Sequence, residues 1–362
     1  MPIITSAEAY LVDLPVEAVR SDAVQSFVKQ ETVFVEIRTD DGILGRGYSY
    51  TIGTGGTAVL AMLRDYLIPR LVGADARRVE AVWRDVYNST RATAVGAITS
   101  LALAAIDTAL WDSRCRRADQ PLWMVAGGAR DRVPLYDTEM GWLHLGVDEL
   151  IAGAKGAVAA GRDGVKIKIG KPDPVEDVER LEAVRSAVGP GMHLMVDANQ
   201  AFTAADAIRR ARLLEPLDVY WFEEPLPADD ISGHVRLAAA TSIPVAVGES
   251  MYSIGQFAEY LKRDAAGVVQ VDVARIGGIT PWLKVAHLAE AHNVPVCPHF
   301  LMELHVSLCA AVPNSRYLEY IPQLSALTSS ALALDGGQAV APTAAGLGID
   351  WNLNAIDDLR VA

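Results

Sequence analysis

The sequence predicts an α/β protein, a modified TIM barrel of the (β/α)7β type preceded by an α+β capping domain. The barrel is predicted by eight short apolar segments that alternate with amphipathic stretches between residues 129 and 324. Three acidic residues in this region, Asp197, Glu223 and Glu249, follow one another at equal intervals of 26 residues. Each ends an apolar run, and a constant interval of this size is typical of consecutive βα units.

The capping domain is expected over residues 1–128. Apolar and polar residues alternate in IITSAEAYLVDL and in TVFVEIRTDDGILGRGYSY, where Asp-Asp-Gly indicates a hairpin, so we expect an antiparallel sheet. Helical periodicity follows in AVLAMLRDYLIPRL, RRVEAVWRDVYN and TAVGAITSLALAAIDTALWDSRC. Strands followed by helices are typical of an α+β domain, which here ends near residue 128.

The barrel is expected over residues 129–324. Its predicted strands are VPLYDTEM, DGVKIKIG, MHLMVDA, VYWFEEP, PVAVGES, GVVQVDVA, VPVCPHF and RYLEY. Amphipathic helices are expected between most of them, for example in VEDVERLEAVRSAVG and TPWLKVAHLAEAHN. The tail, about residues 325–362, is irregular, and we expect it to pack back on the capping domain and complete it.

The composition excludes several classes of protein. A formal net charge of −13 argues against nucleic acid or an anionic membrane as the main partner. The longest apolar stretch, ITSLALAAIDTALW, is too short for a membrane span and contains Asp107. The three cysteines, Cys115, Cys297 and Cys309, are odd in number and lie in apolar sequence, which is typical of reduced thiols. With no export signal visible in MPIITSAEAY, we expect a cytoplasmic protein.

The three evenly spaced acids predict a metal site. The carboxyl ends of barrel strands meet at one mouth, so Asp197, Glu223 and Glu249 should converge there. Three anionic oxygens suit Mg²⁺, and without a cation their mutual repulsion would be costly. A single acid at a strand end is as often a helix cap or a solvated loop residue, but capping does not demand a shared interval.

Two pairs of residues predict acid/base chemistry. Lys166 and Lys168 are two apart on one strand, so both point to the barrel interior, where we expect each ammonium to lower the pKa of the other and to make one a general base. Asp272 and His299 end successive strands, and the Asp would fix the imidazole tautomer. Alone, His299 would more often be a core or loop histidine.

Two further residues are candidate donors to a substrate carboxylate. Glu319 ends the last strand and could donate if it were protonated or strongly hydrogen-bonded, and Asn199 lies two residues after Asp197. Glu224 points away from the site as a structural residue. Two bases around one Mg²⁺ suit removal of the proton α to a carboxylate, because the metal and the donors stabilise the enediolate as charge develops. The predicted partner is therefore a small-molecule carboxylate.

These segments resemble the mandelate racemase subgroup of the enolase superfamily. The resemblance rests on KIK at 166–168, VDAN, FEEP, GES, the Asp272/His299 pair and LE at Glu319, and it extends to TDDGILGRG and AAIDTALWD, so it covers essentially the whole chain. It implies metal ligands at Asp197, Glu223 and Glu249, and acid/bases at Lys168 and His299, the latter oriented by Asp272. It further implies that Lys166, Asn199 and Glu319 hold the substrate carboxylate.

The same enediolate leads to racemisation, epimerisation or dehydration in this subgroup. GYSYTIGTGG, YDTEMGWLH and PHFLMELHVSL look similar to segments of acid-sugar dehydratases of the talarate/galactarate type. The resemblance then implies loss of the β-hydroxyl to give a 2-keto-3-deoxy acid. His299 would protonate the leaving hydroxide if Lys168 takes the proton, although one residue could fill both roles.

The capping loop favours a substrate with a neutral distal end. As the resemblance is interpreted, dehydratases of diacid sugars carry a basic residue in this loop, whereas here Thr51, Ile52 and Thr54 precede Gly55. We therefore expect an aldonate, with hydroxyls of Tyr48, Tyr50 and Thr51 reaching its distal hydroxyls. Arg20 or Lys29 in the other lid segment could still supply a cation.

Three alternatives stay open at this point. The nearest is a racemase or epimerase of a 2-hydroxy acid or an amino-acid derivative, for which SFV at 26–28 leaves apolar room. A retaining glycosidase barrel would explain neither the lysine pair nor three acids in register. A non-catalytic sugar-acid binder is the third. Because lids of this fold often lie near subunit contacts, we also expect a homo-oligomer, a dimer or an octamer.

Overall fold

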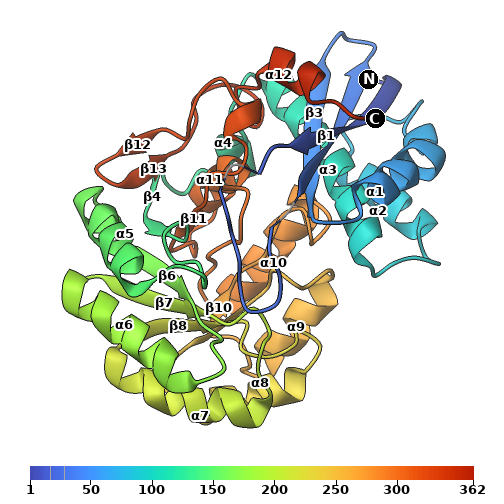
Figure 1. Ribbon diagram of the computed structural model, residues 1–362. Helices are drawn as coiled ribbons and strands as arrows, with labels where there is room; N and C mark the ends of the chain where they lie inside the picture. Colours follow the sequence, from blue (N-terminus) through green and yellow to red (C-terminus); the bar gives the residue numbers. More distant parts are fainter. Residues whose placement is uncertain (17, 28) are drawn as a thin grey trace.

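The computed structural model describes residues 1–362 except 17 and 28, so Val28 of the SFV segment lies outside the described residues (Figure 1). The chain begins with an antiparallel sheet of order β1-β2-β3, made by β1 (Ile4–Leu14), β2 (Gln30–Thr39) and β3 (Leu44–Ile52). The helices α1 (Gly56–Met62), α2 (Val79–Ser89), α3 (Ala97–Ala118) and α4 (Leu122–Ala126) follow, with a π turn at Leu63–Leu67 and a 3-10 turn at Ile68–Arg70.

The long helix α3 lies directly on β3. A Cβ at Gly47 would come within 2.2 Å of the Ala109 nitrogen and 2.3 Å of the Ala105 oxygen, so only glycine allows this approach. Most of α3 is buried on all sides, which explains its apolar sequence without a membrane. Among the described residues, no helix is both long and apolar enough for a transmembrane span.

The second part of the chain forms a parallel barrel. Its seven-stranded sheet has the order β10-β9-β8-β7-β6-β5-β11. The strands are β5 (Leu135–Asp137), β6 (Gly164–Lys168), β7 (His193–Asp197), β8 (Val219–Glu223), β9 (Val245–Val247), β10 (Val268–Val269) and β11 (Leu318–Tyr320). Together with the capping sheet, this arrangement confirms the predicted fold class.

One predicted strand, VPVCPHF at residues 294–300, is wrong as a full strand. Only Val296 pairs, with Val269 on one side and Ser315 on the other, and these two parallel bridges close the ring. The reason is that Pro295 and Pro298 flank this position, and proline lacks the N–H that a strand ladder requires.

Helices surround the strands, as Figure 1 shows for α5 to α8 outside β6, β7 and β8. They are α5 (Val147–Ala159), α6 (Pro174–Val188), α7 (Ala204–Leu214), α8 (Ile231–Ala238), α9 (Ile254–Lys262), α10 (Ile279–Ala291) and α11 (Met302–Ala311). Short 3-10 turns span Glu215–Leu217 and Ser325–Leu327. The beginnings of α6 to α9 are encoded locally, because the side chains of Asp173, Thr203, Asp230 and Ser253 each accept a hydrogen bond from a first-turn N–H.

The tail contacts both parts of the molecule. Its strands β12 (Leu334–Asp335) and β13 (Gln338–Val340) form a small antiparallel sheet with β4 (Arg132–Val133), which precedes β5. Farther on, Trp351 packs edge-on against Phe34 and Tyr48 of the capping sheet, and the chain ends after α12 (Leu353–Asp358). The domain boundaries at 128 and 324 stay predictions.

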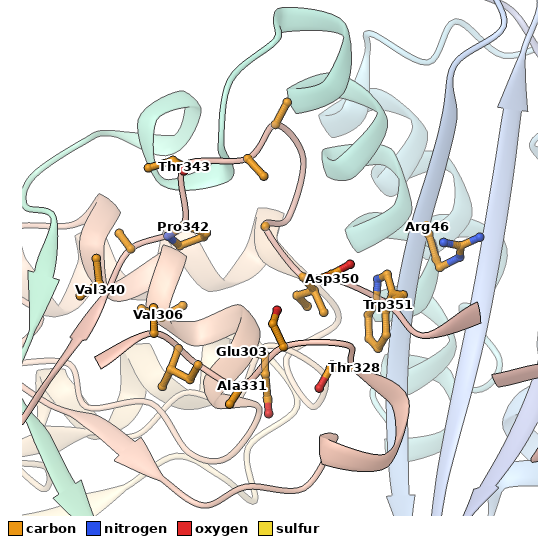
Figure 2. Close-up of a pocket in the computed structure, with 18 of the residues that line it drawn as sticks. Arg46, Glu303, Val306, Thr328, Ala331, Val340, Pro342, Thr343, Asp350 and Trp351 are labelled. Carbon is orange, nitrogen blue, oxygen red and sulfur yellow. The ribbon is translucent and has the colours of Figure 1, made fainter. Parts of the chain in front are cut away.

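A cavity of about 670 Å³ lies between β3, α11 and the tail (Figure 2). Its lining includes Arg46, Glu303, Thr328 and Trp351, and none of its lining residues belongs to the predicted site. The chemistry predicted from the sequence therefore has to be sought elsewhere, at the carboxyl ends of the barrel strands.

Candidate active site

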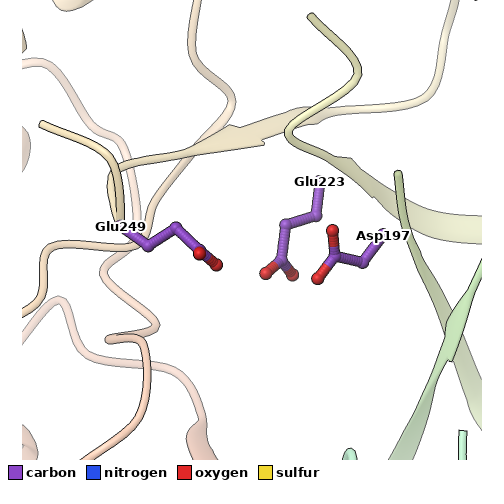
Figure 3. A group of neighbouring side chains, drawn as sticks. All are labelled: Asp197, Glu223 and Glu249. Carbon is purple, nitrogen blue, oxygen red and sulfur yellow. The ribbon is translucent and has the colours of Figure 1, made fainter. Parts of the chain in front are cut away.

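The three evenly spaced carboxylates converge at one mouth of the barrel. Asp197 ends β7, Glu223 ends β8, and Glu249 follows β9 by two residues. Strand register places Asp197 directly beside Glu223. Each of the three offers an oxygen within 4.8 Å of the others, and their carboxylate groups point toward a common space (Figure 3).

This cluster fits a hard divalent cation. Asp197 and Glu223 are fully buried and Glu249 is 8% exposed, so water screens their charges poorly. Burial, together with the charge of Asp197, raises the pKa of Glu223 to about 8. The Oε2 of Glu249 is buried and accepts no hydrogen bond from the residues that the structure describes. Three oxygen ligands of this kind, one with an unused acceptor, are the set that Mg²⁺ prefers.

The lysine pair lies against the carboxylates, because β6 is the neighbour of β7 and Lys168 is in register with Asp197. The Lys168 Nζ lies 2.5 Å from Asp197 Oδ2, and the Lys166 Nζ lies 2.7 Å from Glu223 Oε1. Both lysines point into the barrel interior and both are buried, with exposures of 5% and 1%. The predicted orientation of the pair is confirmed.

The predicted lowering of the lysine pKa values is wrong for this arrangement. Burial lowers the pKa of Lys168, but the adjacent Asp197 carboxylate outweighs burial and raises it above its usual value. Burial also lowers the pKa of Lys166, but the charges of Glu223 and Glu319 outweigh burial and raise this pKa well above its usual value. The carboxylates dominate because each ammonium lies within 2.7 Å of a carboxylate oxygen. Positive charge placed among the carboxylates would weaken this effect.

His299 and Asp272 form the predicted pair. The His299 Nδ1 lies 2.9 Å from Asp272 Oδ2, which places the Nδ1 proton toward the carboxylate and leaves Nε2 free for chemistry. That Nε2 lies 3.4 Å from Glu249 Oε2. Burial lowers the pKa of His299, but Glu249 and Asp272 outweigh burial and raise it.

Glu319 anchors the loop that carries His299. Its Oε2 accepts a 2.7 Å hydrogen bond from the Phe300 N–H, its Oε1 accepts one of 2.6 Å from Thr138, and Lys166 Nζ lies 2.9 Å away. Burial opposes ionisation, yet Lys166 lowers the pKa of Glu319 to about 2. An ionised Glu319 accepts hydrogen bonds only, so the donor role that required its protonation is not supported.

Sequence reasoning missed the anchoring role of Glu319, although the turn it holds is unusual. Phe300 and Leu301 have φ values of 60° and 37°, in the left-handed backbone region that residues other than glycine rarely adopt. The hydrogen bond from Phe300 to Glu319 holds this turn in place. Asn199 also has a left-handed backbone, with φ 42°, and its Oδ1 is buried without a partner.

Of the three predicted capping residues, only Tyr50 reaches the catalytic pair. Its hydroxyl donates a 2.6 Å hydrogen bond to Asp272 Oδ2. The Tyr48 ring packs beside Trp351, and its hydroxyl has no hydrogen-bond partner in the described part of the chain. Thr51 donates to Glu31 at 2.8 Å. Contacts of these three side chains with substrate stay predictions.

The two candidate cations of the lid segment are already paired. Arg20 makes hydrogen bonds of 3.0 and 2.8 Å with Glu139, and Lys29 lies 2.8 Å from Glu31. Sequence reasoning also missed Trp142, whose ring lies 5.3 Å from the Lys168 Nζ and whose indole N–H is buried without a partner. It stands inside the segment YDTEMGWLH, but no spacing rule marks it.

Two family matches cover most of the chain. Residues 7–127 match the family described as mandelate racemase / muconate lactonizing enzyme, N-terminal domain. Residues 149–355 match the family described as enolase C-terminal domain-like.

Individual relatives agree with these matches. A protein of Salmonella typhimurium named L-talarate/galactarate dehydratase is 37% identical over 316 residues, which cover 87% of this chain and 79% of that protein. A protein of Streptomyces coelicolor named 3,6-anhydro-alpha-L-galactonate cycloisomerase is 36% identical over 332 residues, covering 91% of this chain and 92% of that one. Both names confirm the expectation of an enzyme, and the dehydratase name supports the class of hydro-lyases that act on sugar acids.

A solved structure supports the same conclusion for the fold. The crystal structure of a racemase from Streptomyces coelicolor A3(2) with bound magnesium matches with a TM-score of 0.95 and 34% identity, covering 99% of this chain and all of that one. The carboxylate cluster, the lysine pair and the His299/Asp272 pair, set in this fold, agree with the family matches. The chain therefore belongs to the mandelate racemase/muconate lactonizing enzyme family of the enolase superfamily.

Proposed function

We propose that the protein is a Mg²⁺-dependent dehydratase of a sugar acid, and that its substrate is an aldonate with one carboxylate. The observation that carries the proposal is the position of two acid/base side chains on either side of the carboxylate cluster. Lys168 contacts Asp197 at one end, and His299 lies beside Glu249 at the other. A substrate carboxylate held at the cluster would then have an acid or base on each face.

Asp197, Glu223 and Glu249 would hold the cation, which when bound supplies positive charge to the substrate carboxylate. Lys166 stays protonated and donates to the same carboxylate, which stabilises the enediolate as charge develops. Lys168, whose pKa would fall back toward its usual value beside a bound cation, takes the α-proton as a free amine. His299 gives the proton from Nε2 to the leaving β-hydroxyl, so that water departs, and the enol product tautomerises to a 2-keto-3-deoxy acid.

The choice of an aldonate rests on charge. A second carboxylate needs a free cation, and both lid cations are engaged with acids, Arg20 with Glu139 and Lys29 with Glu31. The loop before Gly55 carries no basic residue. The relative that acts on an anhydrogalactonate is named for a monoacid, whereas the Salmonella relative is named for diacids.

The test is a library of aldonates and aldarates assayed with Mg²⁺ for 2-keto-3-deoxy products. We expect turnover of an aldonate. Robust turnover of galactarate with no aldonate activity would refute the monoacid proposal.

A designed variant sharpens this test. Glu139→Gln frees Arg20, so we expect it to gain diacid turnover relative to the wild type. Asp335→Asn is the matched control, because it breaks the 2.8 Å ion pair with Arg132 in the small sheet of β4, β12 and β13, where Asp131 stays 3.1 Å from Arg132, and it should leave the substrate preference unchanged.

A racemase or epimerase is the second candidate, because acid/base groups on both faces also suit return of the proton from the opposite side. The similar magnesium-bound structure is described as a racemase. Mass spectrometry separates the two functions, since a dehydratase product is lighter by one water and an epimer is not.

A further inference from the structure

A hydrogen bond joins the capping sheet to the catalytic pair. Tyr50 lies on β3, and Asp272 follows β10, 222 residues later in the chain. The Tyr50 hydroxyl lies 2.6 Å from Asp272 Oδ2, and both residues are buried, with exposures of 2% and 1%. A bond between a hydroxyl and a carboxylate in such a place is charge-assisted and shielded from water.

Asp272 is held by four donors. Its Oδ1 accepts the backbone N–H groups of Ala274 and Arg275, at 2.7 and 3.1 Å. Its Oδ2 is shared between the Tyr50 hydroxyl and His299 Nδ1. The backbone donors fix one oxygen, so Tyr50 is the donor outside the catalytic pair that holds the other oxygen in position for His299.

Tyr50 is itself held by neighbours of the catalytic pair. Its ring lies 4.5 Å from the ring of Phe300, which in turn stacks on the imidazole of His299 at 5.4 Å. The Arg275 guanidinium lies 5.9 Å from the centre of the Tyr50 ring. These contacts restrict the ring on two sides and leave its hydroxyl directed at Asp272.

We propose that Tyr50 is a positioning residue, which orients the Asp272 carboxylate for His299 and thereby makes the His299 half of the reaction depend on a correctly seated capping sheet. The proposal rests on the proposed function, in which His299 is an acid/base. The two halves of the site differ in this respect. Lys168 donates its hydrogen bond to Asp197 inside the barrel, whereas Asp272 accepts one from Tyr50 of the capping sheet.

The test uses the full chain loaded with Mg²⁺ and follows the His299 Nδ1 proton by NMR in water. A proton in a buried imidazole–carboxylate hydrogen bond resonates far downfield, and its loss in His299→Asn assigns it. In Tyr50→Phe we expect this resonance to move and its exchange with water to become about 10-fold faster, as loss of one hydrogen bond to a charged group implies. An unchanged position and exchange rate would overturn the proposal.

Tyr10→Phe is the matched control. The Tyr10 hydroxyl also donates to a buried carboxylate in the same sheet, Glu36, at 3.2 Å, but far along the chain from the catalytic pair. This variant should leave the resonance unchanged. An equal change in both variants would mean general loosening of the capping sheet, and the positioning role would be refuted.

Kinetics separate positioning from substrate contact. With a converted sugar acid, Tyr50→Phe should lower kcat about 10-fold with KM within about 2-fold of the wild type. A raised KM with unchanged kcat would show that Tyr50 binds substrate, and it would overturn the proposal. The NMR measurement needs no substrate, so an enzyme that converts no aldonate refutes the proposed function and leaves the Tyr50 result to be judged on its own.

Discussion

Replacing Glu249 by Gln should separate metal binding from folding. Glu249 is held more loosely than Asp197 and Glu223, because its Oε2 accepts no hydrogen bond from the described residues and its cationic neighbours, His299 and Arg275, approach it only to 3.4 and 4.0 Å. The substitution keeps the shape of the side chain and removes one negative charge. We therefore expect the metal-free variant to lie within about 1 kcal/mol of the wild type in free energy of unfolding.

The loss of Mg²⁺ affinity in Glu249→Gln should appear when Mg²⁺ is added. A unit charge about 4 Å from another contributes roughly 4 kcal/mol at an effective dielectric constant of about 20, so loss of one anionic ligand should weaken binding at least about 100-fold. At a concentration of about 100 times the wild-type Kd, Mg²⁺ stabilises the wild type by about 2.7 kcal/mol. The variant is then near its own Kd and gains only about 0.4 kcal/mol.

Thermal unfolding with and without Mg²⁺, together with calorimetric titration, measures both quantities. Glu303→Gln is the matched control, because Glu303 is also a shielded carboxylate with an unpartnered Oε2 but lies in the separate cavity of Figure 2. It should keep the full Mg²⁺ effect. The reasoning is refuted if Glu249→Gln keeps that effect too, or if Glu303→Gln loses it.

Three further outcomes are expected. Gly47→Ala should lower the free energy of unfolding by about 2–3 kcal/mol, because the new Cβ meets the α3 backbone. Gly156→Ala is the control and should cause no such loss, because a Cβ there meets no neighbouring atom within 4 Å. Denaturant titration of the two variants measures both free energies. Burial raises the pKa of Asp107 to about 7, so the folded state keeps this proton while the unfolded state loses it between about pH 4 and 7. The stability that this group contributes, at most about 4 kcal/mol, is therefore present at low pH and lost as pH rises. In Asp107→Asn, the free energy of unfolding should lose this dependence on pH. An unchanged pH dependence would contradict the raised pKa of Asp107. Lys168→Met should lower product formation about 100-fold or more while keeping the Mg²⁺-induced stabilisation, and near-normal turnover would exclude Lys168 as the base.

The parts of the site that the sequence could predict are those encoded by a strand and its end. Asp197, Glu223 and Glu249 each close an apolar run; strand register brings Asp197 beside Glu223, and Glu249 joins them from the end of the next strand, β9. The direction of the Lys168 side chain follows from the same alternation. The direction of the Lys168 pKa shift could not be predicted, because it depends on an Asp197 oxygen that lies 2.5 Å away on the next strand.

Contacts between distant segments left no pattern in the sequence. The partners Tyr50 and Asp272 are 222 residues apart, and nothing periodic links them. The engagement of Arg20 by Glu139 likewise depends on how the lid segment folds over the barrel. The strand expected at residues 294–300 is reduced to single bridges for a local reason, since Pro295 and Pro298 interrupt the apolar pattern and lack the N–H that a strand ladder requires.

The last residues of the chain run along β1, on the side not taken by β2. The Leu11 N–H donates to the Ala362 oxygen, the Val361 N–H donates to the Leu11 oxygen, and the Asp13 N–H donates to the Leu359 oxygen. An uncovered strand edge is a template on which a second molecule can add its own strand. Residues 359–362 thus cover this edge of β1 and oppose strand addition by a second molecule, although they are synthesised long after β1. Chains cut before Leu359 should associate through the bare edge of β1 while their barrels are still intact.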